Sequence, residues 1–460
     1  MPPRSEDATT YALIVTRRNA SEILTLPRRT QSELPRVVIR PHRRMAEQLT
    51  AEIANTWGLQ THLLLLLPAP TASHSPCAVV ESTLPNDKTP HGAFWASRTA
   101  AADNATPPED HLIRSALAEL DSYVSRQQTG PFAKPGWLRE LFRWAAAQLA
   151  ASPVRLTGNF RQLNASSTFN LIRLETTGAA VWFKATGNPN KHELPVTLVL
   201  SRLFPEFLPH IIGVHPDWNG WLAAEALGTS LEELTDSSAW QRAAQSLAEL
   251  EIASAEHTDE LLDCQLRDLR LHTLLEVIEP FLARMSQLMA RQEKPTPAPL
   301  ADSELRTLAE RLQDAGAALQ RFELPDTLGH LDFNPGNIIV SSDGCVFLDW
   351  AEACVTSPFL TLQYLREHFN RSHSQKPADP DSLTSAYLRP WASLYSQGIL
   401  RNGLELSSLV AVFAYAVASN AWRSPDILQD PTRAGSFRSL TRRMYREAIR
   451  VGEKSEPCLL

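Results

Sequence analysis

The sequence His-Leu-Asp-Phe-Asn-Pro-Gly-Asn-Ile-Ile-Val at residues 330–340, followed by Val-Phe-Leu-Asp-Trp at 346–350, is the most informative stretch of this chain. Its pattern predicts a polar loop and then two short apolar strands joined by a turn. The hairpin would bring Asp349 back beside Asp332 and Asn337, which lie five residues apart in the loop. Two carboxylates and one amide are hard oxygen ligands, and they suit Mg²⁺ that is shared with substrate phosphates.

A simpler interpretation of this stretch is a turn rich in Asp and Asn before a structural hairpin. That interpretation explains the hairpin. It does not explain why three polar side chains would lie among apolar strands, because burying polar groups without a ligand costs free energy.

The same stretch resembles the catalytic loop of the aminoglycoside phosphotransferase/choline kinase family, distant relatives of the protein kinases. The family pattern is His-Gly-Asp-x4-Asn, followed by Asp-Trp or Asp-Phe. The resemblance implies that Asp332 accepts or orients the proton of the attacking hydroxyl and that His330 braces the loop. It also implies that Asn337 and Asp349 hold Mg²⁺. Leu331 departs from the family glycine, but protein kinases carry arginine there, so a side chain is tolerable.

A kinase also needs a cation on a strand for the ATP phosphates, and a carboxylate on the next helix to position it. The apolar strand Val-Trp-Phe-Lys-Ala at 181–185 supplies Lys184, and Glu193 opens the helix that follows. A lysine on a strand is more often a solvated edge charge, so the phosphate-binding role depends on the catalytic loop downstream.

In this family the phosphate loop lies in the hairpin before the lysine strand, here residues 162–169. That segment holds no glycine, so its small polar residues would have to offer backbone N–H groups and hydroxyls, and Ser166 and Ser167 are the candidates. Residues 221–228 resemble the hinge where backbone groups would meet adenine, with Glu225 and Leu227 in it. Candidates for the acceptor pocket lie on the helices after the catalytic loop: Glu352, Tyr364, Arg366, His368, Trp422 and Arg423.

The N-terminal segment carries a second, weaker resemblance. Residues 51–59 are similar to the helix of a Nudix box, but only Glu52 and Gly58 match it, and Asn55 and Thr56 replace the paired metal-binding glutamates. One carboxylate is too few to hold Mg²⁺ at a diphosphate. An amphipathic helix ended by a C-terminal glycine explains the segment equally well. Both interpretations predict a scaffold or binding role and speak against hydrolysis.

These patterns predict an α+β chain: a separate α/β domain, Nudix-like in the weaker resemblance, followed by a bilobal protein-kinase-like fold with a small sheet-rich lobe and a large helical lobe. The expected domains are 1–128, 129–229 (a linker helix and the N-lobe) and 230–460 (the helical C-lobe with the catalytic loop). The resemblance places the active site between the two lobes.

Composition limits the possible partners. The chain has 460 residues, of which 43% are hydrophobic and 21% are charged, and such a length favours several globular domains. A net charge of −7 gives no electrostatic support for a nucleic-acid partner or for a polybasic membrane anchor. No stretch is apolar enough for a signal peptide or a membrane span, and the five cysteines are scattered. We therefore expect a cytoplasmic protein with reduced thiols.

The predicted function is ATP- and Mg²⁺-dependent transfer of the γ-phosphate to a hydroxyl of a small molecule, which makes the chain an enzyme of the small-molecule kinase class. Its partners would be the nucleotide and an unidentified hydroxyl substrate; relatives act on aminoglycosides, choline-like alcohols, sugars and homoserine. The alternative is a pseudokinase, a regulatory nucleotide-binding protein without phosphoryl transfer. The glycine-free loop and Leu331 motivate that alternative.

Overall fold

The computed structural model describes the following residues: 8–28, 31–40, 44–69, 75–83, 89–107, 109–125, 131–373 and 379–455. Their contacts divide the chain into two compact units, which are described separately. Unit 1 comprises Met1–Leu194 and His210–Glu225, and unit 2 comprises Pro195–Pro209 and Ala226–Leu460. The predicted domain boundary at 128 lies outside the described residues, and the boundary at 229 stays a prediction.

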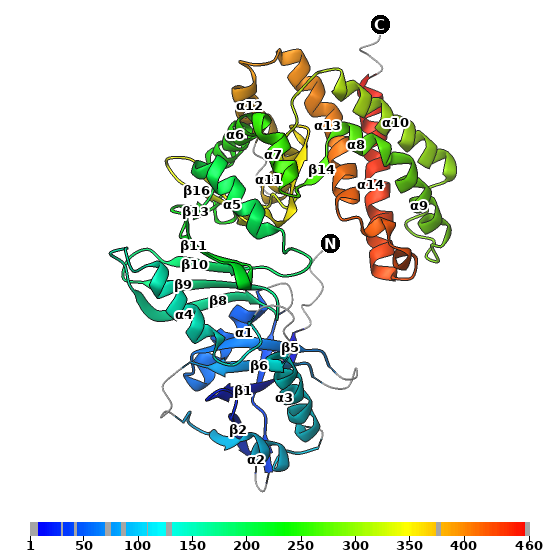
Figure 1. Ribbon diagram of the computed structural model, residues 1–460. Helices are drawn as coiled ribbons and strands as arrows, with labels where there is room; N and C mark the ends of the chain where they lie inside the picture. The colour runs from blue at the N-terminus through cyan, green and yellow to red at the C-terminus, as the bar shows by residue number, and fades with distance from the viewer. Residues whose placement is uncertain are drawn as a thin grey trace. The chain divides into compact units, whose positions relative to one another are not determined.

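Unit 1 begins with a mixed seven-stranded sheet in the order β3-β2-β1-β6-β5, with β4 paired to β1 and β7 paired to β2 (Figure 1). The strands are β1 (Thr9–Arg17), β2 (Glu22–Arg28), β3 (Gln31–Glu33), β4 (Arg36–Ile39), β5 (Thr61–Leu67), β6 (Cys77–Ser82) and β7 (Phe94–Ser97). Its helices are α1 (Met45–Trp57), α2 (Arg98–Asp103) and α3 (Glu109–Ser125). Among the described strand pairs of this sheet, only β1 and β6 run parallel.

Strand β1 is buried on both of its faces. Ala12 and Ile14 belong to one hydrophobic cluster, whereas Leu13 and Val15 belong to another. Successive strand residues point to opposite faces, so an unbroken apolar run is what a central strand covered on both sides requires.

Helix α1 ends at Gly58, which has a left-handed backbone (φ 66°, ψ 21°) and donates its N–H to the carbonyl of Ala54. Glycine adopts this conformation without the steric cost that a Cβ would bring. The predicted helix ended by glycine is confirmed.

A second sheet in unit 1 is antiparallel throughout, in the order β11-β12-β10-β9-β8. Its strands are β8 (Leu156–Ala165), β9 (Asn170–Thr176), β10 (Val181–Ala185), β11 (Ile211–His215) and β12 (Gly220–Ala224). Helix α4 (Trp137–Gln148) precedes the sheet, and α5 (Glu193–Leu203) crosses the division between the units.

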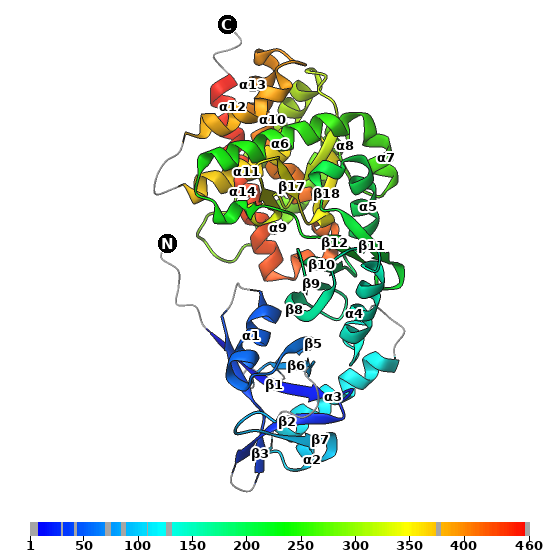
Figure 2. The same ribbon diagram turned by 90° about the vertical axis from the view of Figure 1, so that its left-hand side faces the viewer.

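The two sheets of unit 1 share one hydrophobic core. A single cluster holds Ile14 from β1, Trp137 from α4 and Phe183 from β10. Helix α1 also lies beside β8 (Figures 1 and 2). The N-terminal sheet is therefore packed on the five-stranded sheet as part of the same compact unit.

Unit 2 is mainly helical. Its helices are α6 (Ser237–Ser254), α7 (Thr258–Asp263), α8 (Leu271–Glu276), α9 (Ile278–Ala290), α10 (Asp302–Gln320), α11 (Leu360–Ser372), α12 (Pro380–Trp391), α13 (Gln397–Ala418) and α14 (Pro431–Ser455). Two small sheets lie among them: β13 (Thr229–Ser230) with β16 (Ile338–Val340) and β17 (Cys345–Phe347), and β14 (Arg267–Leu269) with β18 (Ala353–Thr356) and β15 (Thr327–His330).

Short 3-10 helices connect several of these elements along the chain: η1 (Pro205–Phe207), η2 (Pro216–Trp218), η3 (Leu231–Glu233), η4 (Ala255–His257), η5 (Pro335–Asn337), η6 (Trp350–Glu352), η7 (Ala421–Arg423) and η8 (Pro425–Leu428). The predicted α+β class, with a sheet-rich part followed by a helical part, is confirmed.

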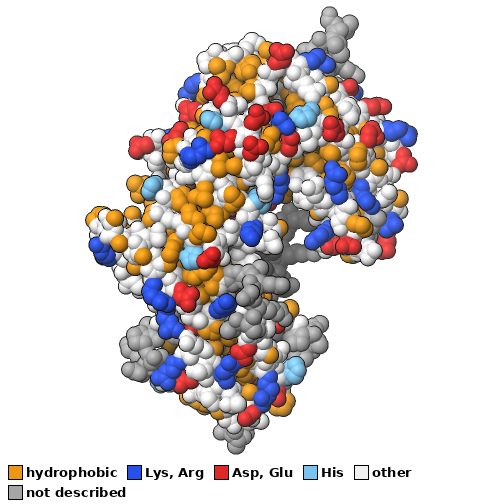
Figure 3. Space-filling model, viewed as in Figure 1, with side chains coloured by type: hydrophobic (Ala, Val, Ile, Leu, Met, Phe, Trp, Pro, Cys, Tyr) orange, Lys and Arg blue, Asp and Glu red, His pale blue; other side chains and the backbone are white. Residues whose placement is uncertain are grey.

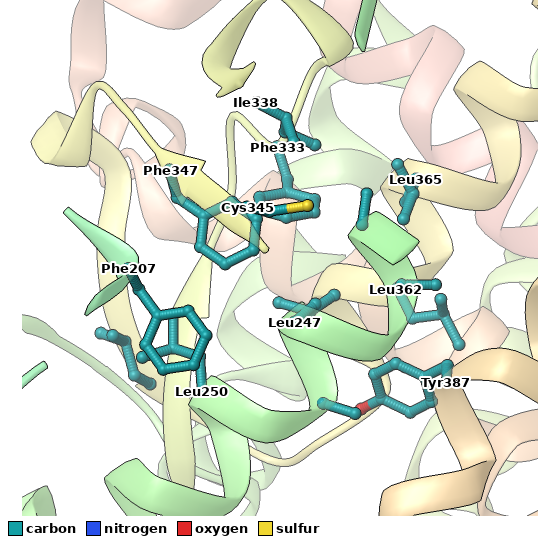
Figure 4. Packing of buried hydrophobic residues seen from close by; sticks show 14 of the residues in the cluster. Phe207, Leu247, Leu250, Phe333, Ile338, Cys345, Phe347, Leu362, Leu365 and Tyr387 are labelled. Atoms are coloured by element: carbon teal, nitrogen blue, oxygen red, sulfur yellow. The ribbon is translucent and has the colours of Figure 1, made fainter. Parts of the chain in front are cut away.

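Aromatic packing supports the hairpin β16–β17 from behind. Figure 4 shows Phe333, Phe347 and Phe207 side by side in the core, and the rings of Phe207 and Phe347 stack with centroids 6.1 Å apart. Phe333 and Phe347 are almost fully buried, with centroids 5.1 Å apart. A close-packed interior has few alternative arrangements, so this packing holds the hairpin in one position.

In the view of Figure 3, acidic and basic side chains are interspersed over the helical unit. Within the described part of the chain, no helix combines the length and apolar character that crossing a membrane requires. The free cysteines there are Cys77, Cys264, Cys345 and Cys354, while Cys458 lies outside the described residues.

Candidate active site

His330, the last residue of β15, is buried and connects the loop to the returning strand. Its Nε2 lies 3.0 Å from the carbonyl oxygen of Leu348, and its Nδ1 lies 3.2 Å from the backbone N–H of Asp332. A carbonyl can only accept and a backbone N–H can only donate, so these contacts assign the neutral tautomer with hydrogen on Nε2. His330 thus contacts both the loop and the end of the returning strand, and its bracing role stays a prediction.

The Asp332 carboxylate is exposed, and two side-chain amides orient it. Asn334 Nδ2 donates to Oδ1 over 3.1 Å, and Asn337 Nδ2 lies 3.3 Å from Oδ2 and 3.0 Å from the Asp332 carbonyl. Because the nitrogen of Asn337 points at Asp332, its oxygen Oδ1 is the atom that could bind a cation. The loop therefore presents one oriented carboxylate to solvent beside one amide oxygen.

Asp349 lies at the open end of the same hairpin. The backbone N–H of Leu348 donates to the carbonyl of Asn337 over 2.9 Å, which places Asp349 one residue beyond a backbone bond to the loop. Asp349 has a left-handed backbone (φ 64°, ψ 64°), which costs about 1–2 kcal/mol for a residue with a side chain. Such conformations persist where the surroundings impose them, and they cluster at functional sites. The next residue, Trp350, is buried and donates Nε1–H to the carbonyl of Phe347.

The departure at Leu331 has a packing explanation. Its side chain is buried in a hydrophobic cluster with Leu269 and Leu360, and its N–H donates to the carbonyl of Glu352. Its φ is not positive, so the backbone does not require glycine here. A leucine at this position extends the core beneath the loop without displacing it.

Lys184 and Glu193 form a buried ion pair in unit 1, with Nζ 2.5 Å from Oε1. The side chains are 12% and 2% exposed, so the lysine is not a solvated edge charge. Lys184 Nζ also lies 5.8 Å from the ring centre of Trp221, its neighbour across β10 and β12. The structure thus brings together the strand lysine and the helix carboxylate of the sequence prediction.

The turn between β8 and β9 uses the hydroxyl of Ser166 for its own closure. Ser166 Oγ accepts from the N–H groups of Thr168 (3.2 Å) and Phe169 (3.0 Å). Gly187, after β10, passes so close that an added Cβ would lie 2.5 Å from the Thr168 Cβ. Ser166 is therefore a turn-capping residue in this structure, and Ser167 lies next to it; a phosphate-binding role for either stays a prediction.

Glu225 and Leu227 lie on either side of the division between the units. Two nitrogens of Arg173 hold the Glu225 carboxylate at 2.7 and 3.2 Å, and this hydrogen bonding lowers the pKa of Glu225. Its side chain is thus occupied. Leu227 is 76% exposed, which is unusual for a large apolar side chain.

A divalent cation fits the donor set at the hairpin. Among the described residues, no group of three or more His, Cys, Asp or Glu side chains could hold a metal. Mg²⁺, however, commonly takes only one or two protein carboxylates, with phosphate oxygens and waters completing its shell. Asn337 Oδ1 and the Asp349 carboxylate would be sufficient protein ligands for such an ion.

Comparison with known families agrees with this geometry. Residues 209–369 match the model of the phosphotransferase enzyme family. The matched segment is similar to that family over about a third of the chain. It contains Asp332, Asn337 and Asp349 and begins after Lys184. No curated protein matches the chain.

Solved structures of this phosphotransferase class resemble the chain distantly. The ethanolamine kinase of Plasmodium vivax is 14% identical over 63% of this chain and 84% of its own, with a TM-score of 0.43. A macrolide 2′-phosphotransferase from Brachybacterium faecium is 14% identical over 65% and 97%, with a TM-score of 0.44. The choline kinase of Cryptosporidium parvum is 13% identical over 65% and 90%, with a TM-score of 0.43. These likenesses are too distant to assign a substrate.

A cavity of about 220 Å³ opens beside Asp332, within unit 2. The residues that matter for its chemistry are Asp332, Tyr364, Glu367, His368, Arg371 and Arg443. Two of these, Tyr364 and His368, are among the predicted acceptor candidates. Glu367, Arg371 and Arg443 were missed, because surface-facing helix positions carry no signal until the helices are packed together.

The other acceptor candidates have different surroundings. Glu352 forms an ion pair with Arg267, and Trp422 is buried and donates Nε1–H to the carbonyl of Val417. The Arg423 guanidinium lies 4.4 Å from the centre of the Trp422 ring. Arg366 lines a second, larger cavity of about 890 Å³.

Proposed function

We propose that this protein is an ATP- and Mg²⁺-dependent phosphotransferase that transfers the γ-phosphate to a hydroxyl of a small molecule. The observation that supports this most is the arrangement at one end of the β16–β17 hairpin. There, Asp332 is exposed and oriented by Asn334 and Asn337, and Asp349 follows the backbone bond from Leu348 to Asn337.

In the proposed mechanism Asp332 accepts a hydrogen bond from the acceptor hydroxyl and takes its proton as the oxygen bonds to the γ-phosphorus. The bond from the γ-phosphorus to the bridging β–γ oxygen breaks in the same step, and ADP leaves. The amides of Asn334 and Asn337 fix the carboxylate before the substrate arrives, so that little reorganisation is needed in the transition state. Mg²⁺, held by Asn337 and Asp349, would neutralise charge on the phosphates. Lys184, oriented by Glu193, would bind phosphate oxygens of the nucleotide.

One observation favours the second candidate, a pseudokinase that binds nucleotide without transfer. Ser166 Oγ already satisfies two backbone N–H groups of the turn that would serve as the phosphate loop. This leaves fewer donors for the β- and γ-phosphates than a glycine-rich loop would offer. The two candidates agree on nucleotide binding and differ only in turnover.

Thermal melting with and without ATP and Mg²⁺ tests nucleotide binding. A ligand that binds the native state raises its stability by mass action, by about 2.7 kcal/mol at one hundred times its dissociation constant. We expect a Mg²⁺-dependent rise in Tm that Asp349→Ala abolishes. Asp343→Ala is the matched control, because Asp343 is an exposed aspartate in the turn of the same hairpin.

Turnover is tested separately by ADP release with a panel of alcohols, followed by mass spectrometry of the phosphorylated product. Product formation would support the enzyme. A Mg²⁺-dependent Tm shift without any product would favour the pseudokinase. The absence of any shift at millimolar ATP would contradict both candidates.

A further inference from the structure

The larger cavity of unit 2 has a volume of about 890 Å³ and is lined mainly by residues of α11, α12, α13 and α14. These four helices are labelled in Figure 1. Cavities of a few hundred to about 1,000 Å³ are typical of small-molecule sites. It shares Gln363, Glu367 and Arg443 with the smaller cavity beside Asp332. A molecule in the larger cavity could therefore extend towards the proposed catalytic carboxylate.

The acid between the two cavities is already neutralised. Glu367 Oε1 is paired with Arg443, and its Oε2 lies 3.3 Å from Arg371. A cationic group that approached Asp332 through this region would meet two guanidinium groups, and the carboxylate between them is occupied. This arrangement disfavours an amine-bearing acceptor near Glu367, because like charges repel strongly where water is partly excluded.

Unlike Glu367, Arg366 has little opposite charge bonded to it. It is half-buried on α11, and within the described part of the chain its one hydrogen bond runs from Nη1 to Gln363 Oε1 over 3.2 Å. No carboxylate among the described residues forms an ion pair with it. Burial, together with the charge of nearby Arg450, lowers the pKa of Arg366, whereas Asp381 and Glu447 partly offset that effect.

Arg450 is turned towards its own helix and α13. Its Nη2 lies 2.7 Å from Glu447 and 2.7 Å from Ser408 Oγ. Arg366 donates only to the neutral amide of Gln363 among the described residues. An anion would compensate its charge better than this amide does. A half-buried guanidinium is costly unless an anion accompanies it, and its planar fork suits carboxylates and phosphates.

We propose that the acceptor of this phosphotransferase is an alcohol that also carries an anionic group, a carboxylate or phosphate, which binds Arg366 while the hydroxyl reaches Asp332. This inference rests on the proposed function and narrows its substrate class. It differs from the cationic acceptors, such as aminoglycosides and choline-like alcohols, that the family resemblance suggests.

Titration calorimetry with inorganic phosphate, without nucleotide, tests the anion site directly. We expect one saturable site in the wild-type protein. Arg366→Gln should weaken it roughly 10- to 100-fold, the range for losing a hydrogen bond to a charged group. Arg306→Gln is the control, since Arg306 is an exposed arginine on α10 outside the cavity. Lys184→Met distinguishes the two cations that could bind phosphate. Phosphate bound at Arg366 should remain in this variant, whereas phosphate bound at Lys184 would be lost.

Acceptor selectivity supplies the second measurement. Glucose, glucosamine and glucose 6-phosphate differ mainly in charge, and ADP release with each is measured for the wild type and for Arg366→Gln. We expect glucose 6-phosphate to be preferred, with KM raised at least about 10-fold by the substitution and kcat little changed.

Four outcomes would overturn the inference while leaving the proposed function standing. In calorimetry, these are phosphate binding that is absent, that persists unchanged in Arg366→Gln, or that disappears in Lys184→Met. In the turnover assay, the outcome is turnover of glucose or glucosamine with a KM that Arg366→Gln does not change. Failure of the proposed function would look different, because no phosphorylated product would then form with any alcohol, whether or not ATP and Mg²⁺ raise the Tm.

Discussion

The side-chain amide of Gln162 on β8 forms two hydrogen bonds with the backbone of Leu63 on β5: it accepts from the N–H over 2.6 Å and donates to the carbonyl over 3.3 Å. The register between β5 and β6 shifts between Leu63 and Leu65, so this is a bulge in the sheet. The Gln162 amide thus makes the pair of hydrogen bonds that a neighbouring strand would make, at a point where the β5–β6 pairing is irregular. These bonds also link the N-terminal sheet to the five-stranded sheet.

Removing this link should destabilise unit 1. Gln162→Leu keeps the volume but leaves a buried N–H and carbonyl without a partner, which should cost about 1–3 kcal/mol per group. Urea unfolding followed by circular dichroism would measure the loss. Gln245→Ala is the control, because Gln245 bonds only to Glu249 at the surface of α6, and it should change stability by less than about 0.5 kcal/mol. Equal effects of the two substitutions would refute this prediction.

The Lys184–Glu193 pair allows stability and activity to be separated. Lys184→Met leaves Glu193 buried without its main counter-charge, and breaking a buried pair in this way typically costs about 3–5 kcal/mol. The double variant Lys184→Met/Glu193→Gln removes both charges and should recover most of that stability, while ATP binding remains impaired. Thermal melting and ATP titration of the three proteins would check both expectations. A double variant that binds ATP normally would remove Lys184 from the site.

Asp332→Asn should abolish transfer and preserve nucleotide binding. The substitution keeps the size of the side chain but removes the proton acceptor, and loss of a general base typically lowers kcat by about 100- to 10,000-fold. The Mg²⁺-dependent Tm shift with ATP should remain close to that of the wild type. An unchanged kcat would show that Asp332 is not the base.

Glu251 should make unit 2 less stable as pH rises. Its carboxyl is buried on α6, accepts from the Tyr387 hydroxyl, and burial raises its pKa from the ordinary 4.5 to about 8. The native state then holds a proton that the unfolded state releases, so stability should be highest near pH 4.5 and should fall towards pH 8, by at most about 1.4 kcal/mol per pH unit. Glu251→Gln should flatten this dependence in denaturant titrations at pH 5 and pH 8. A slope that survives the substitution would assign it to another group.

Much of the candidate site could be predicted because its residues are close in sequence. Asp332, Asn337 and Asp349 belong to one loop and one hairpin, whose turn and alternating apolar residues determine which positions return to the same end. Lys184 and Glu193 are nine residues apart on a strand and the start of the next helix. Local geometry limits where such residues can lie, so their order and spacing carried the prediction.

The acceptor region was not predictable in the same way. Glu367 and Arg443 come from helices far apart in the chain, and their pairing depends on how α11 and α14 pack. The pattern also did not reveal that the hydroxyl of Ser166 accepts from two N–H groups of its own turn, because that bond depends on how the turn closes. Burial of Leu331, likewise, depends on the helices beneath the loop.

The sequence by itself determined the polar loop that begins at His330, the hairpin after it and the order of a sheet-rich part before a helical part. These follow from spacing, turn residues and apolar alternation over short stretches of chain. Tertiary structure alone decided the cavities and the bond between Gln162 and Leu63 across 99 residues. It also decided that Arg366 lies beside the neutral amide of Gln363 without an ion-pairing carboxylate among the described residues. Those features arise from the packing of distant elements, and the partner of each side chain is not encoded in its immediate neighbours.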